Sequence, residues 1–125
     1  MHKSRLAGFI IDCQTEDLDA ATRFWSAALG LKVRAPVPSE SSYRTLDTTP
    51  GDPHLEVQQV AHQSRVHLDI EADDIEAEVR RLEQLGAQRI AAVATWVVMQ
   101  APTGQRFCVV RAERAGFAER ANTWE

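Results

Sequence analysis

Hydrophobic and polar positions along the chain follow one plan twice. The stretch "FIIDCQTEDLDAATRFWSAALG", from Phe9, overlays "VHLDIEADDIEAEVRRLEQLGA", from Val66, with Asp12 falling on Asp69. Each copy reads as an alternating strand followed by a helix. The spacing is just under half the chain, which is too long for a solenoid repeat. The pattern therefore predicts two half-domains related by a pseudo-two-fold axis.

Both predicted helices carry acids in the first turn and a glycine after the last one. The first is expected to begin near residues 15–17 and to end at Gly30. The second is expected to begin at a capping box formed by Asp73 and Glu76, and to end at Gly86. Trp25 falls at helical spacing on the apolar side of the first helix, so we expect it in the core.

Strand patterns follow each helix. "SSYRTLDT" and "HLEVQQV" are separated by the turn signal "PGDP", and "TWVVMQ" and "RFCVV" by "APTG". Weaker strands are expected directly after the helices, at "GLKVRA" and "AQRIAAV". The chain thus reads as βαβββ twice: an α+β fold in a single domain, 1–125, with modules at 6–60 and 64–111. The polar tail, 112–125, breaks from the repeat, and both packing through its aromatic residues and fraying stay open.

Strand alternation predicts which side chains share a face. Val66, Leu68 and Ile70 form an apolar face that is expected to meet a helix. The opposite, polar face is predicted to collect His67, Glu56, Gln58, Asp12 and Cys108. A ligand pocket and a solvated face would show the same pattern.

Some residues near this face have two interpretations. Asp12 is either a pocket acid or, like Asp69, a structural residue near the strand-to-helix turn. Trp96 and Met99 precede the final turn and fit either a cavity wall or the core. The acids of "EADDIE" are interpreted as serving a helix start rather than a metal. His54 lies in a turn-like context and is expected to be exposed.

Composition excludes several function classes. The formal charge of −4 comes without a basic stripe, so nucleic acid is not an expected partner. No apolar run reaches the ~20 residues that span a bilayer, and "MHKSRLAGF" lacks the apolar segment of a signal peptide. We expect no membrane association and a cytoplasmic location. Cys13 and Cys108 are too few for a disulfide framework and are expected to be buried free thiols.

The segments "DLDAATRFWSAALGL", "VHLDIEADDIEAEVRRLEQLGA" and "WVVMQAPTGQRFCVV" resemble the glyoxalase/bleomycin-resistance group of the vicinal oxygen chelate superfamily, in particular its small glyoxalase-like proteins. The resemblance covers nearly all of residues 6–111, in the expected order. It implies two βαβββ modules whose mixed sheet curls around a cavity, with the helices on the convex face. It also implies a homodimer. Metal-using members hold a divalent ion with one ligand from the first and last strand of each module, whereas other members bind a drug without metal.

Carried over to this chain, the resemblance implies an incomplete metal site. His67 stands where the second module supplies a histidine, and Glu56 or Gln58 stands on the last strand of the first module. The first-strand ligand is missing, because Ile10 or Gly8 occupies its position. The final-strand glutamate is replaced by Cys108, a soft ligand that zinc accepts, and the usual "DPxGN" turn reads "APTGQ". The implied metal residues are His67, Glu56 and Gln58.

Three functions follow from these observations. The first is binding of a small organic molecule without a complete metal site, with His67, Gln58, Glu56, Asp12, Trp96 and Cys108 as expected ligand-binding residues. The second is a metal-dependent lyase, isomerase or dioxygenase-like enzyme that uses His67 with Glu56 or Gln58 and zinc, nickel, manganese or iron. The third is a structural module with a vestigial cavity. The missing ligands favour the first, and no catalytic residue is assigned.

Overall fold

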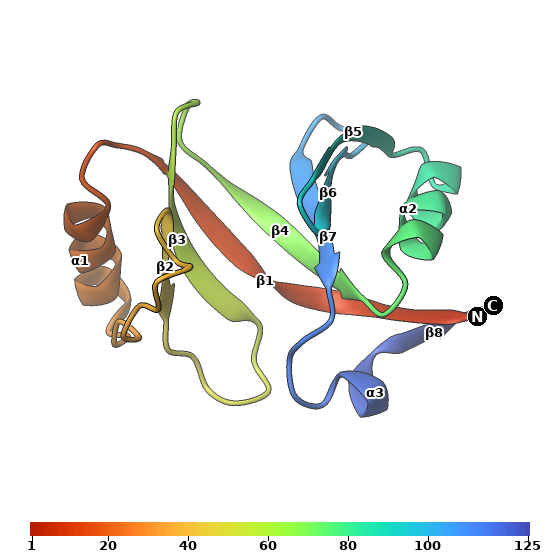
Figure 1. The fold of residues 1–125 in the computed structure, drawn as a ribbon, viewed down its shortest axis with the longest axis horizontal. Helices are drawn as coiled ribbons and strands as arrows, with labels where there is room; N and C mark the ends of the chain where they lie inside the picture. Colours follow the sequence, from red (N-terminus) through yellow and green to blue (C-terminus); the bar gives the residue numbers. More distant parts are fainter. The chain divides into compact units, whose positions relative to one another are not determined.

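A computed structural model describes all 125 residues. The chain forms two compact units. The unit of residues 8–66 is named the first module, and the unit of residues 1–7 and 67–125 the second module. Figure 1 shows the elements in order: β1 (His2–Gln14), α1 (Leu18–Leu29), β2 (Tyr43–Leu46), β3 (His54–Val60), β4 (Arg65–Ala72), α2 (Ile75–Gln84), β5 (Gln88–Val93), β6 (Trp96–Gln100), β7 (Arg106–Arg111), α3 (Phe117–Arg120) and β8 (Asn122–Trp124).

The first module is built around β3, which pairs in parallel with β1 and antiparallel with β2. Helix α1 packs on β2 and β3. It begins and ends as predicted: the Asp17 side chain accepts a hydrogen bond from the backbone of Ala20, and Gly30 closes the helix with a left-handed φ of 69°. The core beneath it contains Leu18, Leu46 and Val57, with Cys13, Ala21, Trp25, Leu31 and Leu55 packed against them.

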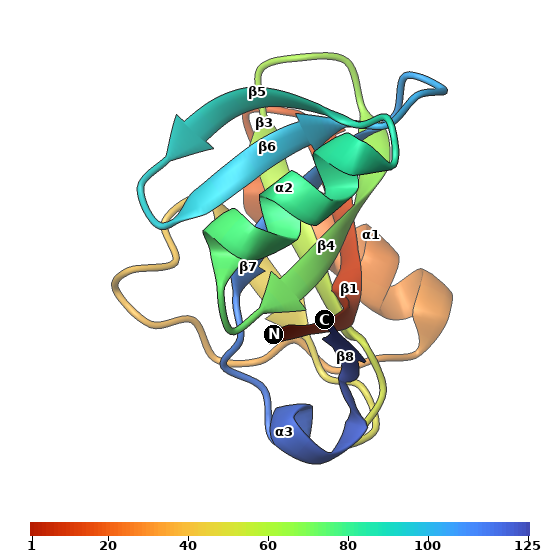
Figure 2. The same ribbon diagram turned by 90° about the vertical axis from the view of Figure 1, so that its right-hand side faces the viewer.

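The second module repeats this topology. Strand β7 pairs in parallel with β4 and antiparallel with β6, and β6 pairs antiparallel with β5. Helix α2 packs on β5, β6 and β7, and Figure 2 views the module with this helix in front. The core contains Ala72, Val79, Leu82, Val97, Met99 and Val109. The predicted α+β fold of two repeated modules is therefore confirmed.

The copies differ in the strand that follows the helix. The second module has β5 as predicted, whereas the predicted strand at "GLKVRA" is reduced to one bridge between Val33 and Leu46. Pro36 and Pro38 follow at once, and proline has no backbone N–H to extend a ladder. The missing strand is a consequence of these two residues.

Two local predictions are wrong. Asp74, not Asp73, is the N-cap of α2, because its side chain accepts the hydrogen bond from the backbone of Ala77. Of the apolar face predicted for β4, Ile70 packs against the core, but Leu68 is 43% exposed and Val66 60% exposed. The core beneath α2 is therefore reached by the end of β4 and not by its start.

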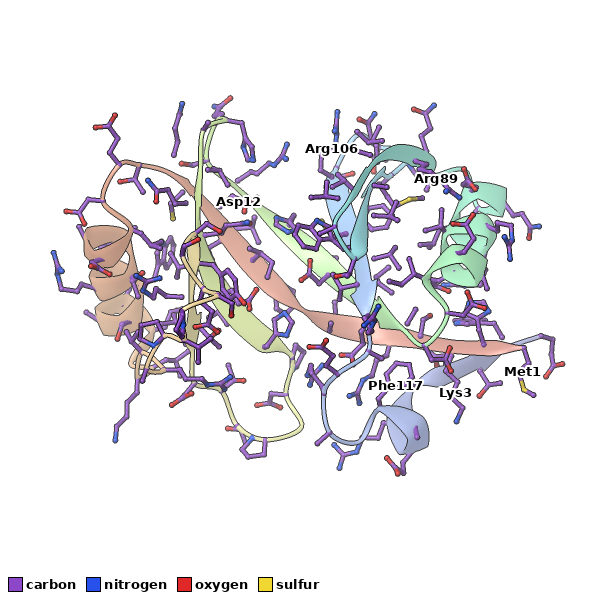
Figure 3. All side chains as sticks on the ribbon, in the orientation of Figure 1. Met1, Lys3, Asp12, Arg89, Arg106 and Phe117 are labelled. Carbon is purple, nitrogen blue, oxygen red and sulfur yellow. The ribbon has the colours of Figure 1, made fainter.

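The C-terminal tail packs onto the second module instead of fraying. Strand β8 pairs antiparallel with the start of β1, where Trp124 is opposite His2. Figure 3 labels Lys3 and Phe117 in this region, and the Lys3 Nζ donates to the backbone carbonyl of Ala118. The Trp124 indole donates to Ser4 Oγ at 2.8 Å, so the tail is held by side chains as well as by the ladder.

A buried carboxylate links these terminal strands to α2. Glu78 is fully buried and accepts hydrogen bonds from His2, Ser4 and Arg81, each at 2.8 Å. The Arg81 guanidinium also lies 3.9 Å from the centre of the Trp124 ring. Burial by itself raises the pKa of Glu78, but the hydrogen bonds from Arg81, His2 and Ser4 outweigh it and lower that pKa below its ordinary value.

Glu78→Gln is expected to destabilise the protein at neutral pH by roughly 3 kcal/mol, because it breaks a buried ion pair. The lowered pKa means that the carboxylate's contribution is complete above the ordinary value of 4.5 and is lost as the pH falls toward the folded value. Urea unfolding at pH 7 and at about pH 3 should therefore show a large difference between wild type and variant that shrinks in acid. Glu76→Gln, on the exposed side of the same helix, is the control and should have a much smaller effect. An equal loss in both variants would contradict this role of Glu78.

Candidate functional site

The sheet of the second module has a polar face opposite α2, named here the second-module face. Phe107, Val109, Val97 and Met99 pack beneath α2, so the residues that alternate with them point away from the helix. The second-module face consists of His67, Asp69 and Glu71 on β4, Arg106, Cys108 and Val110 on β7, and Trp96, Val98 and Gln100 on β6.

Three of these side chains form a cluster of possible metal ligands. Asp69 and Cys108 are direct partners in the parallel pairing of β4 and β7, and His67 is one pleat away on β4. The His67 Nε2 lies 3.5 Å from Asp69 Oδ1, and both side chains are 11% exposed. A ligand atom of each residue, including the Cys108 sulfur, lies within 4.8 Å of the other two. This is the densest group of donor atoms on the second-module face.

Arg106 occupies one end of the face. Its Nε donates to Gln100 Oε1 at 3.0 Å across the β6–β7 pair. Figure 3 labels Arg106 at these strands and Arg89 near α2, where Arg89 pairs with Glu76. The two arginines therefore serve opposite faces of the sheet.

Glu71 occupies the other end and is paired with two arginines of the protein. It is 1% exposed and lies 3.1 Å from Arg114 and 3.6 Å from Arg5. Arg114 also donates to the backbone carbonyl of Ala7. Glu71 was interpreted as serving the start of α2, but its partners show that it anchors the C-terminal tail instead.

The remaining predicted polar residues lie in the first module. Asp12 on β1, labelled in Figure 3, is the direct partner of Gln58 on β3, and Glu56 is one pleat away opposite Ile10. Asp12 is 2% exposed, and one of its oxygens lies 3.7 Å from the Arg65 Nε. The predicted grouping of Asp12, Gln58 and Glu56 on the face opposite α1 agrees with this register, since Leu55 and Val57 pack beneath the helix.

Sequence reasoning missed Arg106 on the second-module face and left Trp96 undecided. Strand alternation puts Asp69 on the same side of β4 as His67, but the role expected for it is structural, and its position beside Cys108 is a finding of the structure. Arg106 was not considered, although its position two residues before Cys108 places it on the same face. Met99 is fully buried in the core, whereas Trp96 is 37% exposed and alternates with the core residue Val97.

The chain's relatives have the same fold. A family model described as a glyoxalase-like domain matches residues 8–110. The chain belongs to the glyoxalase-like domain family. No curated protein sequence matches it.

Solved structures of other proteins resemble this glyoxalase-like chain at low identity. A hypothetical protein from Bacillus halodurans C-125 gives a TM-score of 0.64 at 14% identity, covering 89% of this chain and 96% of its own. A methylmalonyl-CoA epimerase solved with methylmalonyl-CoA and ammonium gives a TM-score of 0.54 at 17% identity, and the match covers 90% of this chain and 98% of the epimerase chain. A glyoxalase/bleomycin resistance protein/dioxygenase superfamily member from Vibrio splendidus 12B01 gives a TM-score of 0.50 at 21% identity, and the match covers 85% of this chain and 98% of its own. At these identities the likeness shows the fold alone, which agrees with the resemblance to the vicinal oxygen chelate superfamily.

The glyoxalase-like chain has no room for a first-strand ligand at Gly8. Gly8 is paired with His54 of β3, and a side chain added at Gly8 would collide with both the ring and the backbone carbonyl of His54. His54, expected in an exposed turn, is thus a half-buried strand residue. Ile10, the other candidate position, is 3% exposed and cannot coordinate a metal.

None of the helices has the length and apolar character needed to cross a lipid bilayer.

Cys13 and Cys108 are both free and half-buried. Burial raises the pKa of the Cys13 thiol, which packs in the core under α1. Cys108, in contrast, lies on the second-module face with His67 and Asp69.

Gly8→Ala is expected to destabilise the protein by about 1–3 kcal/mol, because the added methyl group overpacks the β1–β3 pair. Thermal unfolding should show the loss. The double variant Gly8→Ala, His54→Ala should recover part of it, since the ring is removed while the carbonyl remains. A melting temperature unchanged by Gly8→Ala would contradict the close packing at this position.

Proposed function

We propose that this glyoxalase-like protein binds a small organic molecule on the second-module face, without the complete four-ligand metal site that the family resemblance implies. The observation that carries the proposal is the cluster of His67, Asp69 and Cys108 beside the apolar residues Val98 and Trp96. Ligand sites combine an apolar lining with a few convergent polar groups in this way. Asp12, Gln58 and Glu56 of the first module, which the sequence analysis also expects to bind the ligand, stay predictions.

The polar character of the face argues against a vestigial module. Asp69 is 8% exposed, and it is held in a sheet interior where an apolar residue would be less expensive to bury. Its neighbours His67 and Cys108 are half-buried, and they carry an imidazole and a thiol. A face that only had to support the fold would gain stability from apolar side chains at these positions.

A metal-assisted lyase or isomerase is the second candidate. A nitrogen, a carboxylate oxygen and a sulfur within 4.8 Å of one another form a donor set that suits zinc or a related divalent ion. Such an ion, when bound, would act as a Lewis acid toward vicinal oxygens of a substrate. In that case His67, Asp69 and Cys108 would hold the ion. The set predicted from the sequence, His67 with Glu56 or Gln58, is the alternative set of ligands. The expected homodimer and cytoplasmic location accompany both candidates.

Elemental analysis of tag-free protein, together with thermal unfolding, tests the proposal. For a binder we expect no stoichiometric metal and a ligand-induced stabilisation that survives a chelator and follows RT ln(1 + [L]/Kd), about 2.7 kcal/mol at a hundred times Kd. His67→Ala and Trp96→Ala should reduce the stabilisation. His62→Ala, an exposed histidine in the turn after β3, is the control and should not.

Near-stoichiometric metal that disappears in Cys108→Ser and His67→Ala would overturn the proposal in favour of the enzyme. Loss of metal in Asp69→Asn, with the metal content unaltered in Glu56→Gln and Gln58→Leu, would then assign the ion to His67, Asp69 and Cys108, and the reverse result would assign it to His67 with Glu56 or Gln58. If the protein takes up neither metal nor any compound of a broad ligand panel, the structural module is the one hypothesis of the three that remains.

A further inference from the structure

We infer that the ligand of the second-module face is a small organic acid with one negative charge, whose carboxylate binds Arg106. This inference rests on the proposed function and names the ligand class for the same site. It follows from the charges along the face, from the geometry of the Arg106–Gln100 pair, and from the apolar residues beside that pair.

Arg106 is the cation on this face that no acid of the protein neutralises. Asp69 lies beside His67, and Glu71 lies between Arg5 and Arg114. The partner of Arg106 is the neutral amide of Gln100. A half-buried guanidinium without an acid is unfavourable on its own, so the free protein is prepared for an anion at this point.

The Gln100 hydrogen bond also determines which part of Arg106 receives the anion. It uses the Nε–H, and it fixes the plane of the guanidinium. The two Nη groups remain, and their paired N–H donors match the two oxygens of a carboxylate. Gln100 is therefore a positioning residue, and Arg106 is the binding residue.

The rest of the face limits the size and charge of the ligand. Successive rows along a strand face are about 7 Å apart. The row next to Arg106 and Gln100 contains Cys108 and Val98, and the row after it contains Val110 and Trp96. A carboxylate on Arg106 would thus place a ring or a branched aliphatic group over Val98 and toward Trp96. The carboxylate of Asp69, in the row next to Arg106, disfavours a dianion such as a phosphate monoester.

NMR titration of the ¹⁵N-labelled protein with benzoate, its neutral isostere benzamide, and phenyl phosphate at about pH 8, where the phosphate is dianionic, tests the inference. Benzoate should bind at least about tenfold more tightly than benzamide, because its hydrogen bonds to Arg106 are charge-assisted. It should also bind more tightly than phenyl phosphate. The amide resonances of β6 and β7 should be the ones that shift.

Two variants should remove the preference for the acid by different routes. Arg106→Gln removes the cation. Gln100→Glu leaves Arg106 in place but supplies an internal carboxylate to it, so the ligand's charge loses its advantage. Arg111→Gln is the matched control, since this exposed arginine ends the same strand on the opposite face, and it should keep the wild-type preference. Dispersed amide spectra establish that each variant is folded.

Equal binding of benzoate and benzamide to the face would overturn the inference and leave small-molecule binding intact. A preference for benzoate that survives both Arg106→Gln and Gln100→Glu would overturn it as well. If none of the three probes shifts the resonances of the second-module face, the inference fails, whereas the proposed function is decided by the broad ligand panel.

Discussion

The parallel pairing of β4 with β7 is the constraint on which the second module depends. It places Leu68 opposite Phe107 and Asp69 opposite Cys108, so that one face of the pair supplies the core beneath α2 and the other supplies the polar cluster. A shift of one residue would exchange the faces and turn Phe107 and Val109 away from the helix. Burial of the apolar set therefore holds His67, Asp69 and Cys108 together, although these residues contribute little to the core themselves. The geometry of the candidate site is a by-product of the packing on the opposite side.

The core-facing and polar sides of the strands could be predicted from the sequence, because alternation and helical periodicity are local signals. The duplicated strand and helix, the start of α1 near residues 15–17 and its end at Gly30 could be predicted from spacing. Partner choice between strands is not local, so alternation predicts the side of the strand that Asp69 occupies but not its pairing with Cys108. Arg106 was missed for a different reason: an arginine at a strand end usually points into solvent, and only its bond to Gln100 distinguishes it.

The terminal segments show where periodicity gives no information. Residues 2–5 and the C-terminal tail are polar and belong to no repeat, yet they form a strand pair closed by Trp124, Glu78 and Arg81. These terminal segments are held in place by hydrogen bonds to one buried carboxylate, that of Glu78, from residues distant in the sequence. Without His2, Ser4 and Arg81, Glu78 would be an unpaired charge in the core, and burying it would be strongly unfavourable. The helix residue and the terminal strands thus require each other, which no short window of sequence can show.

The two modules share a topology but differ in how each satisfies the charges on its polar face. In the first module Asp12 lies beside Arg65, so an acid and a base of the protein lie within ion-pair distance. In the second module Arg106 is matched with a neutral amide, and a thiol and an imidazole lie close by. Duplication preserved the residues that pack beneath the helices, because both copies need the same core. The polar faces were free to diverge, since changes there leave that core intact. The copy with the unneutralised cation is therefore the one in which an external anion has most to contribute.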